Sequence, residues 1–336
     1  MPDSAPHSSD KPVKKQFVSR LSPGEAVSET FFLREIEERS TRDGRPFLAL
    51  KLSDRTGILE GRMWGQTLDA GNPAPLTFVR IEGRVERYRG RLRLLVEAAG
   101  VIEAAGLNQR DFLPGSYRST EEMTGFLSYF LTEVFDEDYQ ALLQSFFSRP
   151  GFMEKFSLAP GDVRSHHAYL GGLLEHTVSV ATLCQHTAVQ HPRLNSDLLI
   201  TAALLHDIGK IEEFCYEGRI SLSREGKLLG HVLIGQRMIE QRLREELPDF
   251  PREKELQLVH AVISHHGELE WGAPKRPQSA EALVLHHVDN LDARVKGFFE
   301  VLRGKGELSW PEVRNYFRRP LDEPAAADRE PGYDRG

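Results

Sequence analysis

Residues 198–210 read LLITAALLHDIGK, and this stretch indicates the fold of the chain best. Its first eight residues are apolar except for Thr201, as in a helix buried on every side. His206 and Asp207 stand together where the apolar run ends, and Gly209 follows. Both side chains are of types that bind metal ions, but such a pair can also be an ordinary helix end that faces solvent. The two readings have to be decided by the rest of the chain.

Length and composition indicate a two-domain protein that is not a membrane protein. The chain has 336 residues, of which 40% are hydrophobic, without an apolar run long enough to span a bilayer. Its first residues lack the apolar core of a secretory signal. Two cysteines, Cys184 and Cys215, are too few for a disulfide scaffold, so we expect a reducing cytoplasm.

Charge and histidine are unevenly distributed along the chain. Residues 14–103 contain 16 Lys and Arg against 13 Asp and Glu, although the whole chain has a net charge of −7. Of the 13 histidines, 12 lie at or beyond His166. This segregation predicts a mildly basic N-terminal domain and a histidine-rich C-terminal domain.

The N-terminal domain has the pattern of short β-strands. From about residue 17 to residue 102, runs rich in Phe, Val, Leu and Ile alternate with polar residues and are interrupted by Gly, Asp or Pro. Hairpin turns are expected at Asp43-Gly44 and Arg89-Gly90, and a turn or bulge between Glu86 and Arg87. Five short strands predict an OB-fold barrel over residues 14–105, a fold that commonly binds single-stranded nucleic acid or oligosaccharide.

The C-terminal domain has the pattern of an all-α bundle over residues 120–320, after a predicted linker at 106–119. Apolar residues recur there at helical spacing. Besides a first helical region after Thr120, helices are expected over 166–189, 195–207, 230–246, 253–265, 279–301 and 310–318. The polar, proline-containing ends, 1–13 and 321–336, predict disorder. The fold class is therefore a small all-β barrel followed by an all-α domain.

Metal-capable side chains recur on or at the ends of five predicted helices. They are His176, His206, Asp207, His231, His265 and Asp289. A single histidine on an apolar helix is more often a core residue. Helices that face one another in a bundle can bring such groups together, however, and imidazole with carboxylate suits Mn, Fe or Zn. Recurrence on five helices favours a metal site.

The order of these six residues resembles that of the HD-domain metal-dependent phosphohydrolases. Their flanks, SHHAYLGGLLEHT, LLHDIGK, SHHGELEWGAP and HHVDNLDA, are similar to one branch of that group, the YhaM-type 3'→5' exoribonucleases. Members of this branch join an N-terminal OB-fold to a C-terminal HD domain. The resemblance covers about residues 15–320.

The resemblance implies a two-metal phosphodiesterase. Asp207 would bridge two divalent ions, with Mn as first choice and Fe, Co or Zn as alternatives. His176, His206 and Asp289 would complete the ligands of one ion, and His231 with His265 those of the other. A water between the ions would lose its proton and attack phosphorus. Single-stranded RNA, with single-stranded DNA as a second substrate, would be shortened from its 3' end to nucleoside 5'-monophosphates.

Residues beside the implied ligands have two interpretations each. Lys210 would act in catalysis and contact a phosphate oxygen, or be a solvated lysine at a helix end. His266 would act in catalysis on the phosphate or support a ligand. His166 and His167 would bind and orient the scissile phosphate, or be a pair of loop histidines.

Two further residues lie one helical turn from Asp289. His286 would support the ligands or belong to the core, and Asp292 would support the ligands or face solvent. We assign the remaining histidines considered, His186, His191 and His260, to structure.

The barrel carries a candidate surface for single strands. Residues 80–93 contain six arginines and Tyr88, and arginine with aromatic side chains suits phosphate neutralisation and base stacking. The expected contacts are Trp64, Tyr88, Arg87, Arg89 and Arg91, whereas Phe47 is expected in the core. The arginines also suit a solvated edge strand. The small charge excess predicts weak, salt-sensitive binding.

Two other functions remain open. The first is hydrolysis of a small nucleotide, either a dNTP or a cyclic dinucleotide. The HD enzymes that act on cyclic dinucleotides typically carry GYP after their histidine pair, and HHGELEWGAP lacks it. Such an enzyme would also have little use for an OB-fold. The second is a non-catalytic adaptor that binds single strands, but every expected ligand position is filled.

Overall fold

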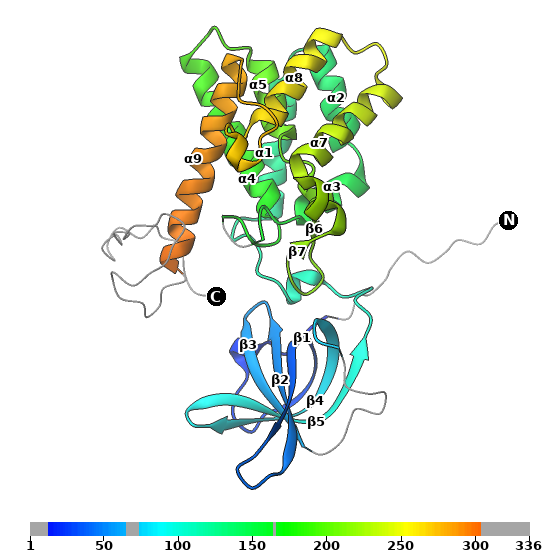
Figure 1. The fold of residues 1–336 in the computed structure, drawn as a ribbon, viewed down its shortest axis with the longest axis vertical. Coiled ribbons are helices and arrows are strands. Elements are labelled where there is room, and N and C mark those ends of the chain that lie inside the picture. The colour runs from blue at the N-terminus through cyan, green and yellow to red at the C-terminus, as the bar shows by residue number, and fades with distance from the viewer. Residues whose placement is uncertain (1–12, 65–73, 164–165, 304–336) are drawn as a thin grey trace, which may run out of the picture. The chain divides into compact units, whose positions relative to one another are not determined.

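The protein is described from a computed structural model, which covers residues 13–64, 74–163 and 166–303 (Figure 1). The ends predicted to be disordered and the helix predicted over 310–318 lie outside these residues, apart from Val13. The chain forms two compact units. Among the described residues, those up to 117 together with 214–223 make the first unit, and those over 118–213 together with 224–303 make the second.

Within the described residues, the first unit contains a closed five-stranded barrel. A short 3-10 helix, Val18–Arg20, precedes it. The strands are β1 (Ala26–Ser40), β2 (Pro46–Asp54), β3 (Gly57–Trp64), β4 (Thr77–Tyr88) and β5 (Arg91–Ile102). They follow the order β1-β2-β3-β5-β4, and β3 with β5 is the parallel pair of an otherwise antiparallel barrel. This topology is that of an OB-fold, so the predicted barrel is confirmed.

Alternation along β2 decides which residues fill the barrel. Leu48, Leu50 and Leu52 are buried in its core. Phe47 lies on the opposite face and is half-buried, against a guanidinium group, Arg62 Cζ, 4.0 Å from its ring centroid. The prediction of a core position for Phe47 is therefore wrong, because neighbouring residues of a strand point to opposite faces.

The β4–β5 hairpin turns where its sequence indicates. Arg89 and Gly90 form a two-residue turn with φ of 51° and 81°, as type I' hairpins require. The irregularity expected between Glu86 and Arg87 is displaced, because the register shifts between Glu82 and Gly83. A Cβ at Gly83 would lie 2.1 Å from the carbonyl oxygen of Leu95, so the strands approach there more closely than a side chain allows.

The barrel unit is larger than predicted. Residues 106–117, expected as a linker, include a 3-10 helix (Gln109–Asp111), and Phe112 packs against Phe78 with ring centroids 4.8 Å apart. The hairpin of β6 (Phe214–Cys215) and β7 (Ser221–Leu222), expected within the helical domain, belongs to the same unit. Gly218 N donates a hydrogen bond to Gln109 Oε1 at 2.9 Å.

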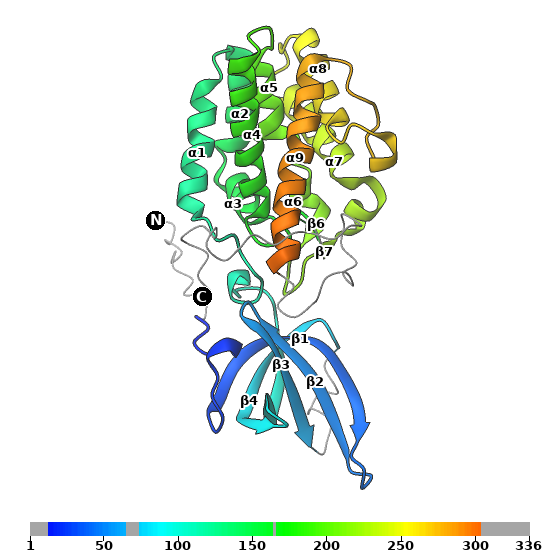
Figure 2. The same cartoon turned by 90° about the vertical axis from the view of Figure 1, so that its left-hand side faces the viewer.

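The second unit is a helical bundle (Figure 2). Its helices are α1 (Thr120–Glu133), α2 (Glu137–Phe147), α3 (Pro150–Leu158), α4 (Gly172–Gln190), α5 (Ser196–Leu205), α6 (Lys210–Glu213), α7 (Arg224–Glu246), α8 (Arg252–Ser264) and α9 (Ala280–Arg303), with a 3-10 helix at Leu269–Trp271. Helix α5 is central, because it packs against α2, α4, α8 and α9. In the described part of the chain, no helix is both long and apolar enough to cross a membrane.

Two helices of the bundle depart from the periodic pattern. Helix α4 begins at Gly172 rather than at residue 166, because Gly171 and His167 take left-handed backbone conformations, with φ of 80° and 58°. Helix α7 is interrupted at Gly230, with φ 75° and ψ 157°. Both breaks lie beside candidate site residues, His176 and His231.

Candidate metal centre

The apolar helix α5 carries the His-Asp pair into the interior. Every residue from Leu198 to Leu205 is buried. The helix ends there, and the exposed fractions of His206 and Asp207 are 0% and 2%. The pair therefore does not face solvent, and the interpretation as an ordinary helix end is wrong.

Neighbouring elements bring the other candidate ligands to this point. His176 lies on α4, and Asp289 lies on α9. His231 follows the break in α7, and His265 follows the last residue of α8. All six residues expected as ligands gather around the carboxylate of Asp207.

One oxygen of Asp207 faces a first group of ligands. His176 Nε2 and His206 Nε2 lie 3.5 and 3.3 Å from Asp207 Oδ2. His176 Nε2 is also 3.0 Å from Asp289 Oδ1 and 3.3 Å from His206 Nε2. Two imidazoles and two carboxylates thus converge on one point.

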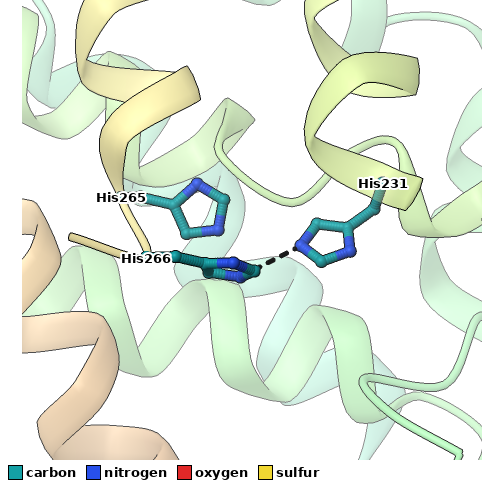
Figure 3. Close-up of side chains that lie close together, drawn as sticks. All are labelled: His231, His265 and His266. Atoms are coloured by element: carbon teal, nitrogen blue, oxygen red, sulfur yellow. Dashed lines mark hydrogen bonds between the residues drawn. The ribbon is translucent and has the colours of Figure 1, made fainter. Parts of the chain in front are cut away.

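The other oxygen of Asp207 faces a second group. His231 Nε2 and His265 Nε2 lie 3.4 and 3.7 Å from Asp207 Oδ1. Figure 3 shows the rings of His231, His265 and His266 turned toward one another, with His231 Nε2 3.3 Å from His266 Nε2. His266 therefore joins this group as a possible ligand, and His231, His265 and His266 offer ligand atoms within 4.8 Å of one another.

The orientation of the imidazoles fits a cation. In each of the five, Nδ1 lies next to an oxygen acceptor, so the neutral ring carries its proton on Nδ1 and turns the Nε2 lone pair toward Asp207 or a neighbouring ring. The Nδ1 acceptors are Asp292 Oδ2 for His176 (2.7 Å), Ala203 O for His206 (2.8 Å), Glu213 Oε2 for His231 (3.0 Å), Val262 O for His265 (2.6 Å) and Trp271 O for His266 (2.8 Å).

An orphaned oxygen supports the same conclusion. Asp207 Oδ1 is buried and accepts no hydrogen bond, although a buried carboxylate oxygen without a donor is costly. Lone pairs of two imidazoles and this oxygen face the same space, an arrangement that is repulsive until a cation enters it. The donor set of imidazole and carboxylate fits a divalent transition ion.

The ionisation of the site residues suits metal binding. Burial opposes ionisation of Asp207, but Lys210 and His206 hold the pKa of its carboxyl well below the usual range. Burial also lowers the pKa of His265 well below its usual value, so this imidazole is neutral. At His176 burial is outweighed by hydrogen bonds to Asp289 and Asp292, which raise its pKa to about 10, and a bound cation would replace that proton.

The other predicted site residues occupy different positions. Lys210 is buried with its Nζ 2.6 Å from Asp207 Oδ2. His166 stacks on His176 with ring centroids 6.1 Å apart, and its buried Nδ1 has no hydrogen-bond partner. Burial, with Lys210 and His176 nearby, lowers the pKa of His166 to about 4, so its ring is neutral.

His167 does not have the free ring nitrogen that contact with a phosphate requires. Its side chain is buried, Nδ1 lies 3.0 Å from Tyr169 Oη and Nε2 lies 3.0 Å from Asp292 Oδ2. The expected role of His167 in binding substrate stays a prediction, since both ring nitrogens are engaged by protein groups in this structure. Its contact with Asp292 Oδ2 at 3.0 Å supports that carboxylate.

The remaining histidines have structural surroundings. His286 Nδ1 donates to the carbonyl oxygen of His265 at 2.9 Å, which supports the backbone of a candidate ligand. His260 Nε2 accepts a hydrogen bond from Gln278 N. His186 and His191 are exposed on or at the end of α4.

A second candidate surface lies on the outer face of the barrel. We call it the aromatic–arginine patch and define it by Phe47, Arg62, Trp64, Tyr88 and Arg93. Arg62 Cζ lies 4.0 and 5.0 Å from the ring centroids of Phe47 and Trp64, and Arg93 Cζ lies 4.0 Å from that of Tyr88. Trp64 and Tyr88 are each 44% exposed. The predicted contacts Arg87, Arg89 and Arg91 are exposed on the adjoining hairpin.

Sequence reasoning missed Glu213 and Arg62, and it did not single out Arg93 among the six arginines of residues 80–93. Glu213 accepts hydrogen bonds from both Nδ1 and the backbone N of His231. The two residues are 18 positions apart in the sequence, so no local sequence pattern indicates the contact. Arg62 and Arg93 approach each other through the parallel β3–β5 pair. The alternation of β3 places Arg62 with Trp64 on one face, which was a usable signal.

The fold and the site define the class of protein: an HD-type helical bundle joined to an OB-fold barrel. Residues 173–294 match the family model described as HD domain. The 3'-5' exoribonuclease YhaM of Bacillus subtilis (strain 168) is 34% identical over 274 residues, covering 81% of this chain and 86% of the relative. That of Listeria monocytogenes serotype 4b (strain F2365) is 30% identical, covering 83% and 89%. The chain belongs to the YhaM family of 3'-5' exoribonucleases, as its sequence motifs predict.

A solved structure resembles the barrel portion. It is the second OB-fold domain of replication protein A from Methanococcus maripaludis, which is 24% identical. The match covers 26% of this chain and 94% of that domain, with a TM-score of 0.23. The assignment of the OB-fold rests on the strand order described above.

The break at Gly230 gives a first prediction. Its φ and ψ lie in a region that only glycine adopts readily, while an added Cβ would make only an ordinary contact, with Glu213 Oε1 at 3.9 Å. Gly230→Ala should therefore lower the free energy of unfolding by about 1–3 kcal/mol through backbone strain alone. It should also weaken divalent-ion binding, because His231 follows directly.

Urea unfolding and calorimetric titration with Mn²⁺ measure the two effects. Gly151→Ala on α3, with ordinary backbone angles and nothing within 4 Å of the added Cβ, is the matched control. Equal unfolding free energies for the two variants would contradict the strain at Gly230.

Proposed function

We propose that this chain is a metal-dependent 3'→5' exoribonuclease that hydrolyses single-stranded RNA to nucleoside 5'-monophosphates. The observation that carries the proposal is the arrangement around Asp207, whose two oxygens face two separate groups of imidazole lone pairs. Family membership supports the reaction, since the relatives are named 3'-5' exoribonucleases. Single-stranded DNA is a second candidate substrate.

The donor set supports the proposal of two divalent ions. His176, His206 and Asp289 would hold one, His231 and His265 the other with His266 beside them, and Asp207 would bridge both. Mn²⁺ is the first choice, with Fe, Co or Zn as alternatives, because availability decides among metals that imidazole and carboxylate accept. When bound, the ions would supply positive charge and Lewis acidity at the scissile phosphate.

Three side chains of the chain itself would act on the phosphate. Lys210 neutralises Asp207 now, and a cation that takes over this carboxylate would free the ammonium for a non-bridging phosphate oxygen. His166 presents a neutral ring with an unpartnered Nδ1, which suits a hydrogen bond to substrate. His266 would either bind the second ion or orient the phosphate. Such groups contribute positioning and charge stabilisation, which dominate phosphoryl transfer.

The aromatic–arginine patch would hold the RNA strand upstream of its 3' end. Guanidinium groups neutralise phosphates, and exposed rings stack with bases of any sequence. Trp64 and Tyr88 supply the exposed rings. With Arg87, Arg89 and Arg91 on the adjoining hairpin, the patch would give salt-sensitive binding that depends little on sequence.

One experiment separates this function from the alternatives. The full-length chain is incubated with Mn²⁺ and, in parallel, with 5'-labelled single-stranded RNA, a dNTP mixture and a cyclic dinucleotide. A ladder that shortens from the 3' end is expected. Hydrolysis of a nucleotide with intact RNA would refute the exonuclease, and binding of RNA without turnover would identify an adaptor.

A substitution on the patch tests its part in the reaction. Trp64→Ala should raise the KM for a long RNA about 10-fold, because a stacked base contributes about 1–3 kcal/mol. It should leave kcat on a dinucleotide unchanged, since kcat reports the reaction at the metal centre and Trp64 belongs to the barrel unit. Phe135→Ala, at a 78% exposed aromatic residue of the helical unit, is the matched control. An equal change of KM in both variants would contradict the role of the patch.

A further inference from the structure

Asp292 is an acidic residue near the metal centre that contacts Nδ1 of His176, the ring nitrogen opposite the one near Asp289. It lies on α9, three residues after Asp289. Its Oδ2 accepts from His176 Nδ1 at 2.7 Å and lies 3.0 Å from His167 Nε2. Its Oδ1 accepts a hydrogen bond from Ser179 Oγ. Both oxygens are thus engaged by protein groups.

The ring of His176 is held between two aspartates with different tasks. Its Nε2 lies 3.0 Å from Asp289 and 3.5 Å from Asp207, on the side of the metal centre. Its Nδ1 donates to Asp292 on the other side. A carboxylate that accepts from Nδ1 fixes the rotation and tautomer of the ring and makes Nε2 a stronger ligand.

His167 holds Asp292 from a backbone conformation that non-glycine residues rarely adopt. Its φ is 58°, and its carbonyl oxygen accepts from Gly161 N at 2.9 Å. A Cβ at Gly172 would lie 2.1 Å from that oxygen, and one at Gly161 would lie 2.6 Å from His167 Cβ. Strain of this kind persists where the surroundings enforce it and is concentrated at functional sites.

A series of contacts continues from His167 to a second connection between α4 and α9. His167 Nδ1 lies 3.0 Å from Tyr169 Oη, which donates to Glu175 Oε2 at 2.9 Å. Glu175 in turn accepts from Lys296 Nζ. The chain of contacts joins α4 to α9, the two helices that carry His176 and Asp289, and so fixes their spacing at the first ion position.

We propose that Asp292 is a positioning residue for His176 and that His167 fixes Asp292 in place. The inference rests on the proposed function in one respect, that His176 binds a divalent ion. Asp292 itself binds no ion and contacts no substrate. Glu213, which accepts from Nδ1 of His231, has the same relation to the second group, so each group contains one imidazole supported by a carboxylate.

The central test measures metal affinity rather than activity. Asp292→Asn keeps the size of the side chain and an oxygen acceptor but removes the charge. Calorimetric titration of the metal-free full-length chain with Mn²⁺ should show about 10–100-fold weaker binding with unchanged stoichiometry. The KM for RNA should stay the same. Unchanged affinity would overturn the proposal, and loss of one whole ion would overturn it by making Asp292 a ligand.

A second variant shows whether Asp292 acts through His176. In a His176→Gln background, Asp292→Asn should weaken Mn²⁺ binding no further. An additional loss in that background would overturn the proposed route. Asp136→Asn is the matched control, because Asp136 caps α2 and pairs with Lys254 outside the metal centre. This control should lower the unfolding midpoint without changing Mn²⁺ affinity.

Conservative and disruptive changes at His167 complete the test. His167→Leu removes the group that faces Asp292 and should reproduce the loss of affinity, whereas His167→Gln keeps an N–H donor at the position of Nε2 and should restore most of it. Equal Mn²⁺ affinities for the two variants would overturn the part assigned to His167.

Failure of the positioning role can be distinguished from failure of the proposed function. If the wild type digests RNA but Asp292→Asn binds Mn²⁺ with normal affinity, only the positioning role is contradicted. If Asp292→Asn weakens Mn²⁺ binding but the wild type leaves RNA intact, only the proposed nuclease function is contradicted.

Discussion

Asp207→Asn is expected to lower kcat on single-stranded RNA by about 10³-fold or more while leaving RNA affinity nearly unchanged. Asp207 has one oxygen toward each ligand group, so the substitution affects both ion positions together. Asparagine has no charge to hold two cations, but it leaves an acceptor for the buried ammonium of Lys210. RNA affinity should persist because the aromatic–arginine patch belongs to the barrel.

The measurements are single-turnover digestion with Mn²⁺ and equilibrium RNA binding without turnover. Asp249→Asn, at an exposed residue beyond the end of α7, is the matched control and should behave as the wild type. A loss of RNA affinity as large as the loss of activity would contradict the division between a barrel that binds and a bundle that cleaves. Retained activity would refute the central place of Asp207.

Gly209→Ala is expected to destabilise the helical unit by about 3 kcal/mol or more. A Cβ at Gly209 would lie 2.1 Å from the carbonyl oxygen of His231 and 2.6 Å from Gly235 N. Both obstacles are backbone atoms, so rotation of a side chain cannot relieve the overlap. Separation of the segment after α5 from α7 would also pull Asp207 and His231 apart.

Urea unfolding followed by circular dichroism measures this effect. Gly125→Ala on α1 is the matched control, since nothing lies within 4 Å of its added Cβ. That control should stabilise slightly, by up to about 1 kcal/mol, because alanine favours helices more than glycine does. Similar unfolding curves for the two variants would show that the approach of α7 to Gly209 is not needed for stability.

Local patterns predicted the elements of this protein well where neighbouring residues decide them. The run from Leu198 to Leu205 is apolar on all sides and forms the central helix. The Arg89-Gly90 pair forms the expected hairpin turn, because glycine tolerates a positive φ. Patterns failed where a residue distant in the sequence decides the local structure. Phe112, in the predicted linker, packs against Phe78 of the barrel unit. The register shift in β4 lies where Leu95 approaches Gly83 closely.

The candidate site also has a part that the sequence predicted and a part that it did not. The types and order of the six expected ligands could be read from the sequence, since each stands at a recognisable point of a helix. The supports of those ligands could not. Asp292 meets His167 across 125 residues, and Glu213 meets His231 across a break that one glycine makes in α7.

By itself, the sequence determined which side chains with metal-binding chemistry the chain carries, and that helices would bury them. Periodicity records burial, and residue type records chemistry, so both can be read along the chain. Only the tertiary structure decided that the two oxygens of Asp207 face different ligand groups, and that the oxygen acceptors beside each Nδ1 turn the Nε2 lone pairs inward. The rotation of a side chain is set by the atoms packed around it, and most of those atoms come from distant parts of the sequence.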